Sequence, residues 1–131
     1  MLDAKVTPFI KPLLKPLIKA LDSKGVTPNQ VTLAGFVIGV LALPFIILNW
    51  WNMALACIIL NRVFDGIDGE LARYQQSSSS AGGFLDICLD FLFYASIPLA
   101  VGIANPQEWG IAAMVLLATF IGTGSSFLAF A

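Results

Sequence analysis

Three uncharged apolar runs constrain this chain more than any other feature of its sequence. They cover residues 31–48, 91–103 and 110–131, and none contains a charged residue. A helix of about 20 apolar residues can cross the hydrocarbon core of a bilayer. Only 11% of the residues are charged and 58% are hydrophobic, whereas about a quarter of a soluble domain is charged. We therefore expect an all-α integral membrane protein.

The segment before these runs, residues 1–24, differs in character from the transmembrane domain expected over residues 25–131. Apolar residues recur at steps of three and four over residues 2–21, opposite a stripe formed by Lys11, Lys15 and Lys19. This pattern predicts an amphipathic helix on the membrane surface. Prolines recur every fourth residue in its first part, so we expect a kinked start and a cleaner helix from Pro16 to Leu21. A loosely attached basic tail is the alternative.

Four crossing helices are expected after this segment. Thr27 is suited to cap the first, with Pro28 and Gln30 behind it, and Pro44 should kink it. The second begins near residue 53 and has only eight purely apolar residues, so it must continue through charged positions to residue 73. The third opens at residues 82–83, after a serine-rich turn that we interpret as plain linker, and the fourth is residues 110–131. Because the chain stops in an apolar run, it looks like the front part of a longer protein.

The basic residues predict how the helices are oriented. All seven lie before the first crossing or in the last part of the second, and the loops 49–52 and 104–109 contain none. By the positive-inside rule, the N-terminus and the turn of residues 74–81 face the cytoplasm. We therefore expect a multi-pass protein of the cytoplasmic (inner) membrane with its site on the cytoplasmic side.

Four aspartates at the ends of the second and third crossings form the candidate site: Asp65, Asp68, Asp86 and Asp90. Spacings of three and four put each pair on one helix face, and a short turn brings the two pairs together. Carboxylates in a partly dehydrated site call for cations. Oxygen ligands suit Mg²⁺, Mn²⁺ or Ca²⁺, and the absence of His and of paired Cys argues against zinc. Two such ions could clamp a diphosphate, while a spare carboxylate accepts a proton from a hydroxyl.

These aspartates belong to a longer motif, D-x2-D-G-x2-A-R-x8-G-x3-D-x3-D. The motif is met in full by Asp65, Asp68, Gly69, Ala72, Arg73, Gly82, Asp86 and Asp90. It resembles the signature of the class I CDP-alcohol phosphatidyltransferase family. Thr27-Pro28-Asn29, together with Thr32, is similar to the way the family begins its first transmembrane helix. The specific resemblance covers about residues 25–90.

The resemblance implies an enzyme of phospholipid biosynthesis that moves a substituted phosphate (phosphatidyl) group from a CDP-linked lipid, such as CDP-diacylglycerol, to an alcohol, releasing CMP. It implies a bundle of six transmembrane helices, of which this chain shows four, and a homodimer. Two Mg²⁺ or Mn²⁺ ions would be held by the four aspartates, and Asp90 would also be the catalytic base. The nucleotide would be bound by Gly69, Ala72, Arg73, Gly82, Asn29 and Thr32. Membrane lipid is an expected partner, and nucleic acid is not.

Other interpretations of the same residues stay open. An intramembrane prenyltransferase also holds a metal-bound diphosphate with aspartates. A divalent-cation pathway or a membrane scaffold would need no reaction at all. The aspartates could also be ordinary charges at the membrane interface, paired with Arg62 and Arg73. The acceptor alcohol is not identified, and these two arginines are the basic residues that could hold an acceptor phosphate.

Overall fold

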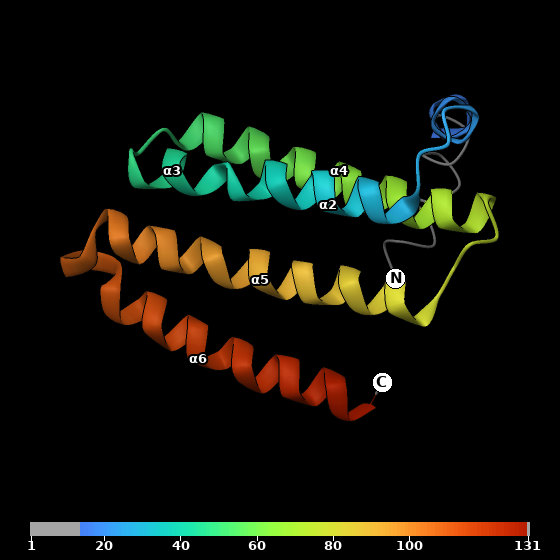
Figure 1. The fold of residues 1–131 in the computed structure, drawn as a ribbon. Coiled ribbons are helices and arrows are strands. Elements are labelled where there is room, and N and C mark those ends of the chain that lie inside the picture. Colours follow the sequence, from blue (N-terminus) through green and yellow to red (C-terminus); the bar gives the residue numbers. More distant parts are fainter. Residues whose placement is uncertain (1–13, 131) are drawn as a thin grey trace.

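The computed structural model describes residues 14–130, and all regular structure in this range is helical (Figure 1). The prediction of an all-α chain is confirmed, whereas predictions for residues 1–13 and 131 lie outside the described residues. A helix of residues 14–23 comes first. It is followed by α2 (Pro28–Val40), α3 (Ala42–Ile47), α4 (Trp51–Tyr74), α5 (Ser80–Ala104) and α6 (Pro106–Phe130).

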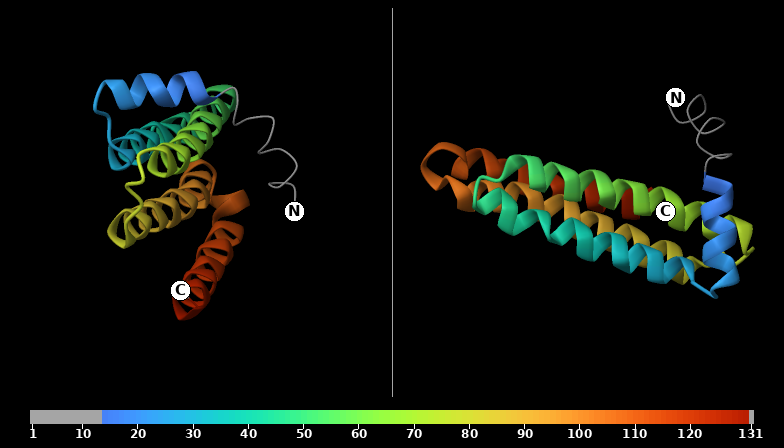
Figure 2. Two further views of the ribbon diagram at one scale, coloured as in Figure 1. Left: turned by 90° about the vertical axis from the view of Figure 1, so that its right-hand side faces the viewer. Right: turned by 90° about the horizontal axis from the view of Figure 1, so that it is seen from above.

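The helix of residues 14–23 lies across one end of the other helices (Figure 2). Its Ile18 is buried against Val31, Ile67 and Leu71, and its lysines are exposed. Gly25 follows the end of this helix, and its positive φ of 69° suits a residue without a side chain. The predicted helix is thus confirmed for its described part, and its apolar face packs on α2 and α4. Its position on the membrane surface stays a prediction.

The first crossing begins and breaks where its sequence predicts. Thr27 and Gln30 form a capping box, with backbone to side-chain distances of 3.4 and 3.0 Å. The helix is interrupted at Leu41, which separates α2 from α3. Pro44 explains the break, because it has no N–H to donate to the carbonyl four residues earlier and its ring crowds that carbonyl.

Two helix starts differ from the prediction. α5 begins at Ser80 instead of Gly82, because the Ser79 hydroxyl accepts a hydrogen bond from the Gly82 N–H at 3.0 Å and so caps the helix. α6 begins at Pro106 instead of residue 110, since proline is well suited to the first helical position. The predicted loop of residues 104–109 is therefore largely helical.

The helices pack unequally around α5. α2 and α3 contact both α4 and α5, and α6 packs on α5 (Figure 1). Glycines bring α2 close: a Cβ on Gly35 would lie 2.7 Å from Phe64 Cβ, and one on Gly39 would lie 2.8 Å from the Phe93 ring. In contrast, no Cα of α4 comes within 8 Å of a Cα of α5. Arg62 of α4 nevertheless reaches Asp90 of α5, at 2.6 Å.

Three segments are long and apolar enough to cross a membrane: Pro28–Ile47, Ser80–Ala104 and Pro106–Ser126. α4, with 24 residues, lies beside them and carries charged residues from Arg62 to Arg73. Many large apolar side chains are exposed on these helices, among them Leu33, Val37, Ile59, Leu92 and Ile111. Exposed apolar faces of this extent suit contact with lipid. The multi-pass membrane prediction is therefore confirmed for three of the four predicted crossings, without α4.

Candidate cation and nucleotide site

Three of the four predicted aspartates meet between α4 and α5. Asp65 and Asp68 come from successive turns of α4, and Asp86 comes from α5. Each offers a carboxylate oxygen, and these oxygens lie within 4.8 Å of one another. We refer to Asp65, Asp68 and Asp86 as the aspartate trio. Such a convergence of oxygen ligands can hold a hard divalent cation.

The buried member of the trio shows that a cation fits. Asp68 is 5% exposed, and its Oδ2 is buried without a hydrogen-bond partner among the described residues. A buried carboxylate oxygen without a partner is costly, and its two neighbours in the trio are also acidic. The arrangement can therefore accommodate a positive ion between the three side chains.

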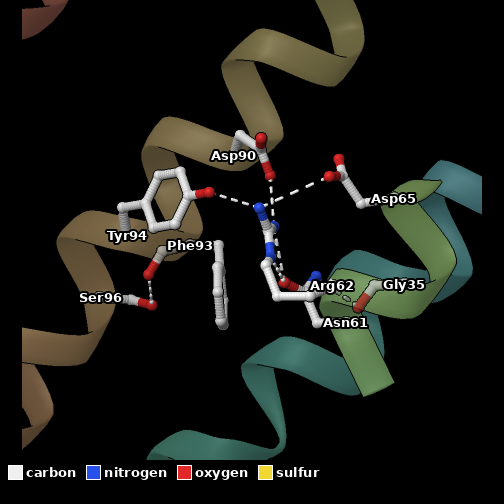
Figure 3. Close-up of polar contacts among 8 residues, drawn as sticks. All are labelled: Gly35, Asn61, Arg62, Asp65, Asp90, Phe93, Tyr94 and Ser96. Carbon is white, nitrogen blue, oxygen red and sulfur yellow. Dashed lines mark hydrogen bonds and ion pairs between the residues drawn. The ribbon is translucent and has the colours of Figure 1, made fainter. Parts of the chain in front are cut away.

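Asp90 lies beside the trio but is held differently. Its Oδ1 is 2.6 Å from Arg62 Nη2, and Arg62 Nη1 is 3.6 Å from Asp65 Oδ2 (Figure 3). The side chain of Arg62 on α4 therefore bridges to α5, although the backbones of the two helices do not approach each other closely. Pairing of Asp90 and Asp65 with Arg62 agrees in part with the interpretation of the aspartates as interface charges. Asp68 and Asp86 have no such ion pair among the described residues. The roles of Asp90 as base and cation ligand stay predictions.

Residues that sequence reasoning missed hold Arg62 in place. Asn61, 4% exposed, donates to the Gly35 carbonyl at 2.9 Å, and its Oδ1 accepts from Arg62 Nε and Nη2 at 3.0 and 2.7 Å. Arg62 Nη1 also donates to the Tyr94 hydroxyl, and the guanidinium carbon lies 5.4 Å from the Phe93 ring centre (Figure 3). Asn61 directly follows an apolar run, and a buried amide needs hydrogen-bond partners. This position was the signal in the sequence that Asn61 takes part in a polar network.

A cavity of about 210 Å³ opens on one side of the trio. All six residues predicted to bind the nucleotide line it: Asn29, Thr32, Gly69, Ala72, Arg73 and Gly82. Asp68 and Asp86 form its inner wall, and Ser77–Ser79 of the turn line it as well. The interpretation of these serines as plain linker overlooked that position. A single cavity thus joins the predicted nucleotide residues to the trio.

Glycines keep this cavity open at two places. A Cβ on Gly82 would lie 3.1 Å from Ser79 Oγ and 3.2 Å from Asn29 Oδ1, and one on Gly69 would lie 3.2 Å from Arg73 Nη2. Arg73 is itself positioned by the Gly69 carbonyl at 3.1 Å and by Glu70 at 3.2 Å. Its side chain is 63% exposed, so the guanidinium remains accessible to an anionic ligand.

A second, much smaller hollow lies on the other side of the trio. All four aspartates line it, together with Asn61 of α4 and several residues of α2 and α5. Its volume is only about 10 Å³. Thr32, Asp68 and Asp86 border both spaces. The trio therefore separates an open cavity that can admit part of a nucleotide from a space of the size of a water molecule or an ion.

Comparisons with known proteins agree with this site. The model of the CDP-alcohol phosphatidyltransferase family matches residues 25–131. Inner membrane protein YnjF of Escherichia coli is 56% identical over the whole chain, which spans 63% of that protein. Archaetidylinositol phosphate synthase of Pyrococcus horikoshii is 37% identical over 90% of the chain and 63% of its own length. The bifunctional IPC transferase and DIPP synthase of Thermococcus kodakarensis is 38% identical over 70% of the chain and 22% of its own length.

The chain thus spans less than two thirds of the length of these relatives. No solved structure matches it. The family match, in contrast, extends from the residues that precede α2 through the whole of α6, and it includes every residue of the trio and of the nucleotide cavity. This chain belongs to the CDP-alcohol phosphatidyltransferase family.

Proposed function

We propose that this chain transfers a substituted phosphate group from a CDP-linked lipid, such as CDP-diacylglycerol, to an alcohol acceptor and releases CMP. The observation that carries the proposal is a single cavity that is lined both by the six predicted nucleotide residues and by two aspartates of the trio. Family membership supports the reaction class. One named relative is an archaetidylinositol phosphate synthase, which favours a phosphorylated alcohol as one acceptor to test.

In this proposal the trio would hold a divalent cation, Mg²⁺ or Mn²⁺. Such a cation would neutralise the carboxylates and supply stabilisation for the charge that develops on the phosphoryl oxygens. The predicted second cation needs Asp90, whose carboxylate here binds Arg62 at 2.6 Å. One cation in the trio is therefore the part of the two-cation prediction that the geometry supports.

The side chains divide the remaining tasks. The nucleotide lies against Gly69, Ala72 and Gly82, whose small size leaves room for it, and Arg73 contacts the phosphates. Asp90, at the edge of the trio, accepts the proton of the acceptor hydroxyl. The acceptor oxygen forms a bond to the phosphorus that carries the lipid, the bond from this phosphorus to the oxygen of CMP breaks, and CMP leaves with the electron pair.

The position of the site agrees with chemistry on a lipid headgroup. The helix of residues 14–23 and the turn between α4 and α5 lie at the same end of the bundle (Figure 1). That end carries Lys15, Lys19, Lys24 and Arg73, so the positive-inside rule places it in the cytoplasm. A location in the inner membrane follows the printed name of one relative. Pairing with a second copy of the chain stays a prediction.

The deciding experiment measures the thermal stability of the chain in detergent with CDP, in Mg²⁺ and again in EDTA. A ligand at 100 times its Kd stabilises by about 2.7 kcal/mol, so we expect a cation-dependent rise of the melting temperature that Asp68→Asn abolishes. Release of CMP from CDP-dioleoylglycerol is then followed with glycerol 3-phosphate, serine and inositol phosphate. No shift with CDP but a shift with a prenyl diphosphate would favour a prenyltransferase instead. No shift with either ligand in a folded sample would favour a non-enzymatic role.

A further inference from the structure

We propose that Arg62 is a positioning residue that keeps Asp90 apart from the aspartate trio, so that the trio binds the cation while Asp90 remains available to the acceptor hydroxyl. The part of this inference that concerns turnover rests on the proposed function. The part that concerns cation binding does not. Arg62 lies outside the motif of eight residues and does not line the nucleotide cavity.

The first step of the argument is the way in which Arg62 divides the four carboxylates. Its guanidinium contacts Asp90 at 2.6 Å and Asp65 at 3.6 Å. Asp90 lies only one helical turn after Asp86 on α5, so without this contact it can turn toward the trio. A charged hydrogen bond of this kind fixes a carboxylate more firmly than a neutral one. The pair therefore sets which side of the site Asp90 faces.

The second step is that Arg62 itself is fixed from several sides. Asn61 accepts from two of its nitrogens and is anchored to the Gly35 carbonyl. Tyr94 accepts from a third nitrogen, and the guanidinium lies over the rings of Phe93 and Tyr94, 5.4 and 4.9 Å from their centres. A guanidinium held in this way by residues of α4 and α5 has little freedom to follow a substrate. Each of its three nitrogens already donates a hydrogen bond inside the protein.

The third step separates this role from binding of an acceptor phosphate, which the sequence left open for both arginines. Arg73 is 63% exposed and lines the nucleotide cavity, whereas Arg62 is 31% exposed and has protein acceptors around it. An anion that bound Arg62 would first have to displace Asp90. Arg62 is therefore assigned to Asp90, and Arg73 is the arginine left for a phosphate.

The test compares Arg62→Gln, Arg62→Lys and Tyr94→Phe with the unchanged chain in detergent. Binding of Mn²⁺ alone is measured from the electron paramagnetic resonance signal of the free ion. CMP release from CDP-dioleoylglycerol is measured with the acceptor panel above. The Lys19→Gln variant is the control, because it removes one positive charge from an exposed site outside this network.

Arg62→Gln should move the two measurements in opposite directions. The Kd for Mn²⁺ should fall roughly three- to tenfold, because a positive charge leaves the vicinity of the cation and Asp90 can join the trio. The kcat for CMP release should fall roughly 10- to 100-fold, with KM for the CDP-lipid unchanged, because the base is misplaced. Arg62→Lys, which keeps the charge, should retain the Mn²⁺ affinity and recover part of kcat. Tyr94→Phe should show a smaller loss of kcat.

A double variant tells whether Asp90 is responsible. In Arg62→Gln with Asp90→Asn, the gain in Mn²⁺ affinity should disappear, and the two changes should not be additive. A parallel loss of Mn²⁺ affinity, turnover and melting temperature in the Arg62 variants would show a packing role instead and overturn the inference. Unchanged values in Arg62→Gln would overturn it as well. If the unchanged chain releases no CMP, the proposed transfer fails, while the Mn²⁺ measurements still decide the role of Arg62.

Discussion

Asn61 of α4 donates its side-chain amide to the main-chain carbonyl of Gly35 on α2, at 2.9 Å. The bond exists because the two helices approach closely at this level, where a Cβ on Gly35 would lie 2.7 Å from Phe64 Cβ. The amide oxygen of the same side chain accepts a hydrogen bond from Arg62, which in turn donates to Asp90. Three side chains, those of Asn61, Arg62 and Asp90, thus connect the close contact between α2 and α4 to the edge of the candidate site.

Substitution of Gly35 by Ala should therefore destabilise the chain. The added methyl group forces α2 away from α4 and stretches the bond from Asn61, and such overpacking costs about 1–3 kcal/mol. The melting temperature in detergent measures the effect. Gly66→Ala is the matched control, because Gly66 also lies in a helix but its Cβ would meet nothing within 4 Å. An equal loss in both variants would contradict the close approach at Gly35.

The sequence could predict those parts of the fold that depend on local signals. The capping residues before α2, the interruption caused by Pro44 and the extension of α4 through charged positions all follow from residues close together in the chain. Likewise, local spacing along two helices that are joined by a short turn was sufficient to predict that the aspartates of the trio meet. Gly69, Ala72, Arg73 and Gly82, which line the nucleotide cavity, followed from the resemblance of the motif to the family.

Features that depend on how helices pack could not be predicted in the same way. Pairing of aspartates with Arg62 was one open interpretation of the sequence, but that Asp90 makes the 2.6 Å pair depends on how α4 and α5 lie relative to each other. The role of Asn61 depends on the approach of α2, which Gly35 and Gly39 permit only in three dimensions. The early starts of α5 and α6 were missed because Ser79 and Pro106 were assigned to loops and not to helix starts.

Leu71 is expected to be essential for the attachment of the helix of residues 14–23. It is fully buried, with 0% exposure, in a cluster with Ile18, Val31 and Ile67. Leu71→Ala should lower the free energy of unfolding by about 2–4 kcal/mol. Leu60→Ala on the same helix removes the same atoms from a side chain that is 46% exposed and should cost much less. Similar melting temperatures for the two variants would show that the cluster adds little stability.

Gly82→Ala should weaken the binding of CDP without an effect on cation binding. The new Cβ would lie 3.2 Å from Asn29 Oδ1 and 3.1 Å from Ser79 Oγ, so Asn29 must shift within the cavity. We expect an increase of roughly fivefold in the Kd for CDP, about 1 kcal/mol, measured by titration in Mg²⁺. Gly83→Ala adds a methyl group with nothing within 4 Å on the same cavity and should have a smaller effect. A larger effect at Gly83 would argue that the nucleotide lies elsewhere.

Asp68→Asn should change stability in opposite directions with and without a cation. In EDTA the variant should be more stable by about 1–3 kcal/mol, because it removes a buried carboxylate oxygen that has no hydrogen-bond partner and that faces Asp65 and Asp86. In Mn²⁺ the order should reverse, since the unchanged chain gains stability from the bound ion and the variant does not. Glu108→Gln, at the exposed start of α6, should respond equally in both conditions. Melting temperatures in EDTA and Mn²⁺ measure both effects, and a variant that still gains full stability from Mn²⁺ would show that the trio is not the cation site.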